Sequence, residues 1–186
     1  MLRLRYVNKA DPNFWTRVLA PSPSDADDLP LRPSSEAVPH DLIELLFFAY
    51  RDFVGDPDRI LADYGFGRAH HRVLHFVERR PGLTIAELLD ILQITKQSLN
   101  RVLKELVETG FVESRTGTQD KRQRNLYATQ AGRELAVRLA QLQGKRINGA
   151  LAQVGPEAGD VVARYLAGLI DPSERKKVQD ALAGPR

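Results

Sequence analysis

Beyond residue 40, apolar residues recur every three to four positions, the spacing of amphipathic α-helices. Helices that share this pattern are predicted over residues 41–54, 68–80, 130–154, 157–169 and 172–183. Gly55-Asp56-Pro57 is expected to end the first of them, because glycine and proline both disfavour a continuing helix. The pattern therefore predicts a mainly α-helical protein.

A capping box predicts where one further helix begins. The Thr84 hydroxyl can accept the amide proton of Glu87, whose carboxylate can reach back to the Thr84 amide. This helix is expected over residues 84–91, and a tight turn at Gln93-Ile94 leads to a second helix over residues 95–109. Two helices joined by such a short turn form a helix-turn-helix arrangement, here residues 84–109.

Two short strand-like runs follow, FVESR at residues 111–115 and NLYAT at residues 125–129. They predict a β-hairpin over residues 111–129 with a long, charged tip. The predicted fold class is mainly α with a small β-hairpin wing, a winged helix-turn-helix with flanking dimerisation helices. Dimerisation is expected because the helices at 41–54 and 130–183 present more apolar surface than a small winged helix can cover.

The chain is expected to divide into three parts. Five of the eleven prolines fall in residues 20–40, so residues 1–39 are predicted to be a flexible N-terminal extension with a proline-rich linker. Residues 40–154 are the expected winged-helix DNA-binding domain. Residues 155–186 are expected to form C-terminal dimerisation helices.

Composition and charge narrow the function. There is no cysteine, which excludes disulfides and thiolate metal sites and favours a reducing, cytoplasmic setting. No apolar run is long enough to span a membrane. Residues 66–133 hold twelve lysines and arginines against seven acidic residues, a charge of +5 within a chain of net charge +3. This distribution suggests a module that binds a polyanion.

In a helix-turn-helix, the N-terminal residues of the second helix contact base edges in the major groove of double-stranded DNA. The candidate contacts there are Thr95, Lys96, Gln97, Ser98, Asn100 and Arg101. The wing adds Lys121, Arg122 and Arg124, which can follow the backbone or enter the minor groove. Asp120 is expected to orient Arg122 or Arg124 by an ion pair.

Two stretches resemble the MarR-type winged-helix transcriptional regulators. They are RVLHFVERRPGLTIAELLDILQITKQSLNRVLKELVETGFVE, residues 72–113, and DKRQRNLYATQAG, residues 120–132. Within the family, KQSLNRVLKEL is most similar to a PetP-like subgroup. The resemblance implies a homodimer with interlocking terminal helices, palindromic operators and, in many members, a small-molecule effector in the cleft between the dimer and DNA-binding parts. By position, Asp120 and Arg122 match the wing pair of the family.

The leading hypothesis is a ligand-responsive repressor that binds DNA as a homodimer. The alternative is a winged-helix module that binds proteins and not DNA, because fold alone does not determine function. No nucleophile elbow, phosphate-binding loop or dinucleotide fingerprint is present, so no enzyme activity and no cofactor are expected.

Two groups of side chains have competing interpretations. His71, His75 and Glu78 share a helix face and could bind a metal, but no metal site is expected. Polar surface, or phosphate contact by the neighbouring Arg68 or Arg72, is favoured instead. The aromatic residues of the first helix are expected in the core or a dimer contact, with a ligand pocket as the alternative. They are Phe47, Phe48, Tyr50 and Phe53.

Overall fold

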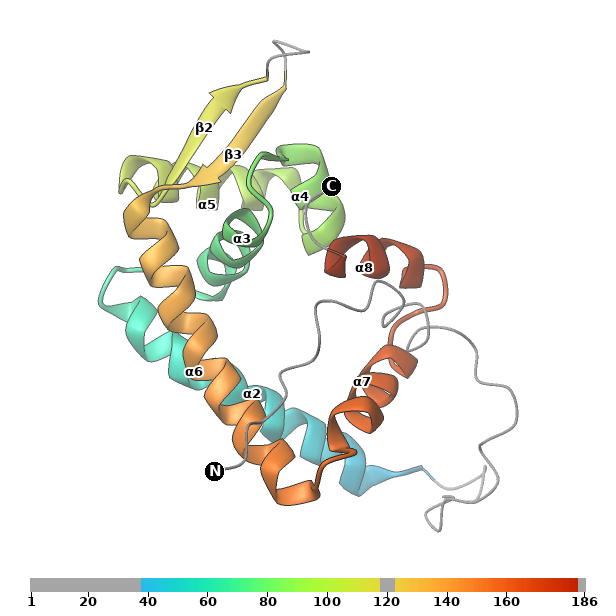
Figure 1. Ribbon diagram of the computed structural model, residues 1–186. Coiled ribbons are helices and arrows are strands. Elements are labelled where there is room, and N and C mark those ends of the chain that lie inside the picture. The colour runs from blue at the N-terminus through green and yellow to red at the C-terminus, as the bar shows by residue number, and fades with distance from the viewer. Residues whose placement is uncertain (1–37, 118–122, 184–186) are drawn as a thin grey trace. The chain divides into compact units, whose positions relative to one another are not determined.

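The computed structural model describes residues 38–117 and 123–183, which form seven helices and three short strands (Figure 1). The elements are α2 (His40–Ala62), α3 (Arg68–Arg79), β1 (Leu83–Thr84), α4 (Ile85–Leu92), α5 (Lys96–Glu108), β2 (Val112–Thr116), β3 (Arg124–Ala128), α6 (Gln130–Val154), α7 (Ala158–Gly168) and α8 (Arg175–Leu182). The predicted fold class, mainly α with a small β-hairpin wing, is confirmed, and the role of the flanking helices in dimerisation remains a prediction. No helix among these is long and apolar enough to cross a membrane.

The described residues divide into two compact units. The terminal unit contains residues 38–52 and 151–183, and the central unit contains residues 53–117 and 123–150. Helices α2 and α6 each continue from one unit into the other. The three-part division expected from the sequence remains a prediction.

The first helix is longer than its sequence predicts. Gly55 and Pro57 do not end it, and α2 continues to Ala62. Pro57 is fully buried, and Leu61, one turn later, lies in the hydrophobic core. The prediction is wrong because tertiary burial of this stretch offsets the lost helical hydrogen bond, which costs about 3 kcal/mol at a proline.

The core of the central unit joins α3, α4, α5, α6 and the small sheet. Fully buried leucines from these elements meet there: Leu74, Leu88, Leu99, Leu106, Leu126 and Leu139. The apolar face of the predicted helix at 95–109 therefore lies inside, which leaves its opposite face for solvent.

The predicted hairpin is confirmed. Strands β2 and β3 pair antiparallel, from Val112 opposite Ala128 to Thr116 opposite Arg124, and lie side by side in Figure 1. A third strand, β1, pairs with the other edge of β3 to give the order β1-β3-β2. The sequence pattern did not indicate β1, because two residues are too few for alternation to be visible.

Helix α6 begins tightly against the end of the hairpin. The Thr129 hydroxyl accepts a hydrogen bond from the Gly132 amide (3.1 Å) and donates one to the Gly110 carbonyl (2.7 Å). A Cβ atom at Gly132 would lie 1.9 Å from the Phe111 carbonyl oxygen. The Thr-x-x-Gly sequence thus combines a helix cap with a close backbone contact.

Candidate nucleic-acid interface

The predicted helix-turn-helix consists of α4 and α5. The Glu87 amide donates to the Thr84 hydroxyl (3.2 Å), and the Thr84 amide donates to the Glu87 carboxylate (2.8 Å), which confirms the capping box. Gln93 has a φ of 51° in the turn. The Thr95 hydroxyl accepts the Ser98 amide (3.2 Å) and so caps α5.

An arginine from α3 supports the turn. Arg72 Nη2 donates a hydrogen bond to the carbonyl oxygen of Leu92, the last residue of α4 (2.9 Å). Because the last carbonyls of a helix have no partner within it, this bond satisfies one of them. The sequence favours phosphate contact as the role of Arg72 and gives no sign of this hydrogen bond, since its partner lies twenty residues away.

A buried histidine joins α3 to the second half of α5. His70 Nδ1 accepts a hydrogen bond from the Gly67 amide (3.1 Å), and Nε2 lies 2.7 Å from Glu105 Oε2. A backbone amide can only donate, so in neutral His70 the proton is on Nε2 and is donated to Glu105. The ring also stacks on Phe66, with centroids 4.7 Å apart. His70 therefore positions α5.

The first half of α5 presents a polar surface to solvent. All five candidate side chains on the helix are exposed: Lys96, Gln97, Ser98, Asn100 and Arg101. Among the described residues, Lys96, Gln97, Asn100 and Arg101 have no side-chain hydrogen bond or ion pair. Both acidic residues of α5 lie in its second half, where Glu105 contacts His70 and Glu108 pairs with Lys104.

The wing contributes one candidate within the described residues. Arg124 is exposed on β3, and its Nη1 donates to the Thr116 hydroxyl across the hairpin (3.3 Å). Asp120, Lys121 and Arg122 lie outside the described residues, so the expected ion pair of Asp120 remains a prediction.

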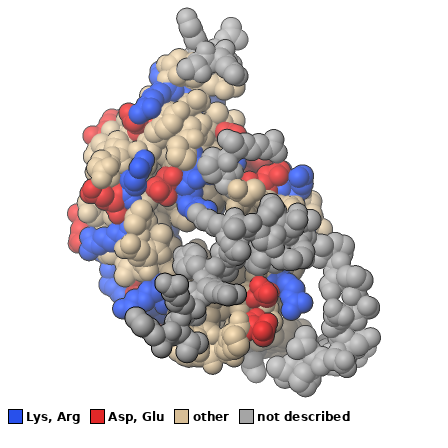
Figure 2. Space-filling model, in the orientation of Figure 1, with Lys and Arg blue, Asp and Glu red and all other residues tan. Residues whose placement is uncertain are grey.

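A second wing arginine, Arg115, already has partners on the hairpin itself. Arg115 lies over the Tyr127 ring, 4.4 Å from its centroid, and pairs with Glu113. On the face shown in Figure 2, acidic side chains lie among the basic ones and do not leave one continuous basic patch.

The histidines of α3 do not form a polar surface. His71 is buried and His75 half-buried, and burial is the main cause that lowers the pKa of both imidazoles. The protonated form of His75 lowers the pKa of His71 further, and Arg79 does the same for His75. The polar-surface interpretation is therefore wrong for His71. In the described part of the chain, no three acidic, histidine or cysteine side chains are grouped to hold a metal ion.

Three aromatic residues of α2 lie outside the hydrophobic core that the described residues form. Phe47 is 66% exposed, and Phe48 and Tyr50 are also more than half exposed. Phe53 is half-buried. The core interpretation is wrong for the first three, and contact with a second copy remains a proposal.

Comparison with known proteins gives concordant matches. The sequence profile of the MarR family matches residues 64–123. The chain is 47% identical over 137 residues to the HTH-type transcriptional regulator PetP of Rhodobacter capsulatus, covering 74% of this chain and 82% of that protein.

Solved structures share the fold at low identity. One is Streptococcus pneumoniae FabT in complex with DNA, with a TM-score of 0.63, 16% identity, and coverage of 70% of this chain and 93% of that chain. Another is the transcriptional regulator SlyA, with a TM-score of 0.59, 18% identity, and coverage of 75% and 95%.

Proposed function

This chain belongs to the MarR family of transcriptional regulators, and on that premise we propose that it is a ligand-responsive repressor that binds palindromic operators as a homodimer. Members of this family are DNA-binding proteins without enzymatic activity. A cytoplasmic location is part of the proposal, because a regulator must reach chromosomal DNA.

The observation that supports DNA contact is the exposed polar first half of α5, where four side chains have no hydrogen bond or ion pair among the described residues: Lys96, Gln97, Asn100 and Arg101. A helix N-terminus with lysine, arginine and amides can bind phosphates and base edges at once. We propose contacts from Thr95, Lys96, Gln97, Ser98, Asn100 and Arg101, with Lys121, Arg122 and Arg124 on the wing. In this arrangement Gln97 and Asn100 suit adenine, and Arg101 suits guanine.

The apolar surface of the terminal unit supports the homodimer. Ten large apolar residues of this unit are at least half exposed: Val38, Leu42, Leu45, Phe47, Phe48, Tyr50, Val154, Val161, Leu166 and Leu169. A soluble monomer seldom exposes this many large apolar side chains. A second copy of the chain presents the same apolar residues, and contact between the two copies would cover both sets.

Repression and ligand response would follow from the dimer geometry. Two recognition helices must lie about 34 Å apart to enter successive turns of one DNA face. An effector that binds more tightly to dimers with a different separation of the recognition helices would increase the population of those dimers. Fewer dimers would then fit the operator, and its occupancy would fall.

Duplex binding at several salt concentrations tests the proposal. We expect log Kd to depend linearly on log salt concentration, because each neutralised phosphate releases counterions. The duplexes should come from selection on genomic DNA, which also reveals operator symmetry. A monomer with no affinity for any duplex at 50 mM salt would contradict the proposal and favour a protein-binding module.

A further inference from the structure

Helix α2 contains two residues that disfavour a regular helix, close to the point where it passes from one unit to the other. The division falls after Asp52, and Gly55 and Pro57 follow within one and a half turns. Glycine is among the least favourable residues in a helix interior, and proline removes a helical hydrogen bond. A bend in α2 is therefore easier here than elsewhere along the helix.

Helix α6 has a similar region close to the other crossing, which falls after Ala150. Gly144 and Gly149 lie within this helix, and a Cβ atom at either would meet no atom within 4 Å. Close packing therefore does not require glycine at these positions. Their effect is to make this part of α6 easier to bend.

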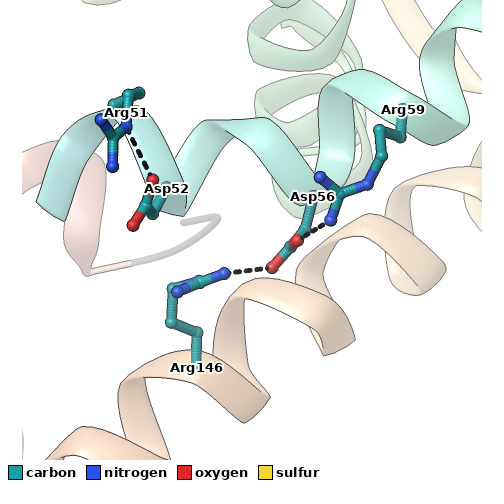
Figure 3. A network of polar contacts seen from close by, with 5 residues as sticks. All are labelled: Arg51, Asp52, Asp56, Arg59 and Arg146. Carbon is teal, nitrogen blue, oxygen red and sulfur yellow. Dashed lines mark hydrogen bonds and ion pairs between the residues drawn. The ribbon is translucent and has the colours of Figure 1, made fainter. Parts of the chain in front are cut away.

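An ion pair joins these two regions. Asp56, between Gly55 and Pro57, accepts a hydrogen bond through Oδ2 from Arg146 Nη2 at 2.7 Å (Figure 3). Arg146 lies between the two glycines of α6, ninety positions away in the chain. The second carboxylate oxygen, Oδ1, pairs with Arg59 on α2 itself. Hydrogen bonding from Arg146, with the positive charges of both arginines, lowers the pKa of Asp56.

We propose that Asp56 and Arg146 are positioning residues, a clasp that fixes the angle between α2 and α6 where both helices bend most easily. In the homodimer of the proposed function, on which this inference rests, that angle sets the separation of the two recognition helices. A solvent-exposed ion pair contributes little to folding stability. The expected effect of the pair between Asp56 and Arg146 is therefore on the distribution of angles between α2 and α6.

Operators with different half-site separations test the clasp. Arg146→Gln should weaken binding at the preferred separation about two- to fivefold, the equivalent of losing one exposed ion pair. Binding to separations altered by one or two base pairs should weaken less, so selectivity between separations narrows. Affinity for a duplex with one half-site should not change, because Arg146 does not contact DNA in this proposal.

Arg59→Gln is the matched control. It removes a partner of the same carboxylate but leaves the bond between α2 and α6, so separation selectivity should match that of the wild type. In the Arg59→Gln background, where no second cation lies beside position 56, exchanging the charges by Asp56→Arg with Arg146→Asp should restore the selectivity that either single substitution loses.

A distance measurement gives a second readout that does not need DNA. Because the chain has no cysteine, Glu108→Cys provides one spin-label site per protomer at the end of α5. The label-to-label distance distribution in the dimer should broaden with Arg146→Gln and stay unchanged with Arg59→Gln.

Identical separation profiles and distance distributions for wild type, Arg146→Gln and Arg59→Gln would overturn the clasp while leaving the proposed function intact. An equal loss of half-site affinity in Arg146→Gln would also overturn it. A wild-type protein that is monomeric, or indifferent to half-site separation, would refute the proposed function and the clasp together.

Discussion

At the scale of the residue, Gly132 allows α6 to begin tightly against the end of the hairpin because glycine has no side chain. The Cβ atom of an alanine would lie 1.9 Å from the Phe111 carbonyl oxygen, a backbone atom that cannot move without displacing the wing. We expect Gly132→Ala to lower the free energy of unfolding by about 1–3 kcal/mol. Urea denaturation followed by circular dichroism measures this change.

Gly149→Ala is the control for this prediction, since it lies in the same helix with no atom within 4 Å of the new Cβ. It should stabilise the protein by about 0.5–1 kcal/mol, because alanine favours the helix. A similar loss of stability in both variants would show that the contact with Phe111 is not the cause.

At the scale of the element, the two halves of α5 differ in their surroundings. The second half is held through Glu105 by His70, whereas the first half leaves Arg101 exposed without a partner in the described structure. We expect Arg101→Ala to change which operator is preferred, at about 1–3 kcal/mol for a lost bidentate contact with a base. Site selection from random duplexes, with competition binding, measures the preference.

Lys104→Ala is the matched comparison on the same helix. Lys104 is exposed but pairs with Glu108 and is not among the proposed contacts. Its removal should leave the selected sequence unchanged. Identical selected sequences for Arg101→Ala and the wild type would show that Arg101 does not read a base.

At the scale of the whole molecule, the exposed apolar surface of the terminal unit is expected to be covered by a second copy. Phe47→Asp would place a charge in that contact and remove an aromatic side chain. We expect the dimer dissociation constant to rise at least about a hundredfold, measured by sedimentation equilibrium. Val137→Asp, at an exposed apolar position of the central unit, should leave the dimer intact.

Local patterns in the sequence were enough to predict the elements around the interface. Helical periodicity and the Thr84–Glu87 capping box each depend on residues within a few positions of one another. Such short-range physics is the same before and after folding, so α4, the turn, α5 and the hairpin were all predictable. The exposed polar face of α5 was predictable as well, because the opposite face of the helix is apolar.

The contacts between distant segments could not be predicted from such local patterns and became visible in the folded chain. It carried α2 through Pro57, bonded Arg72 to the end of α4, buried His70 against Glu105 and joined Asp56 to Arg146. Each depends on partners that are far apart in the chain or on burial that no local pattern specifies. Propensity favoured a break at Pro57, and packing outweighed it because core burial is gained only when the whole unit has assembled.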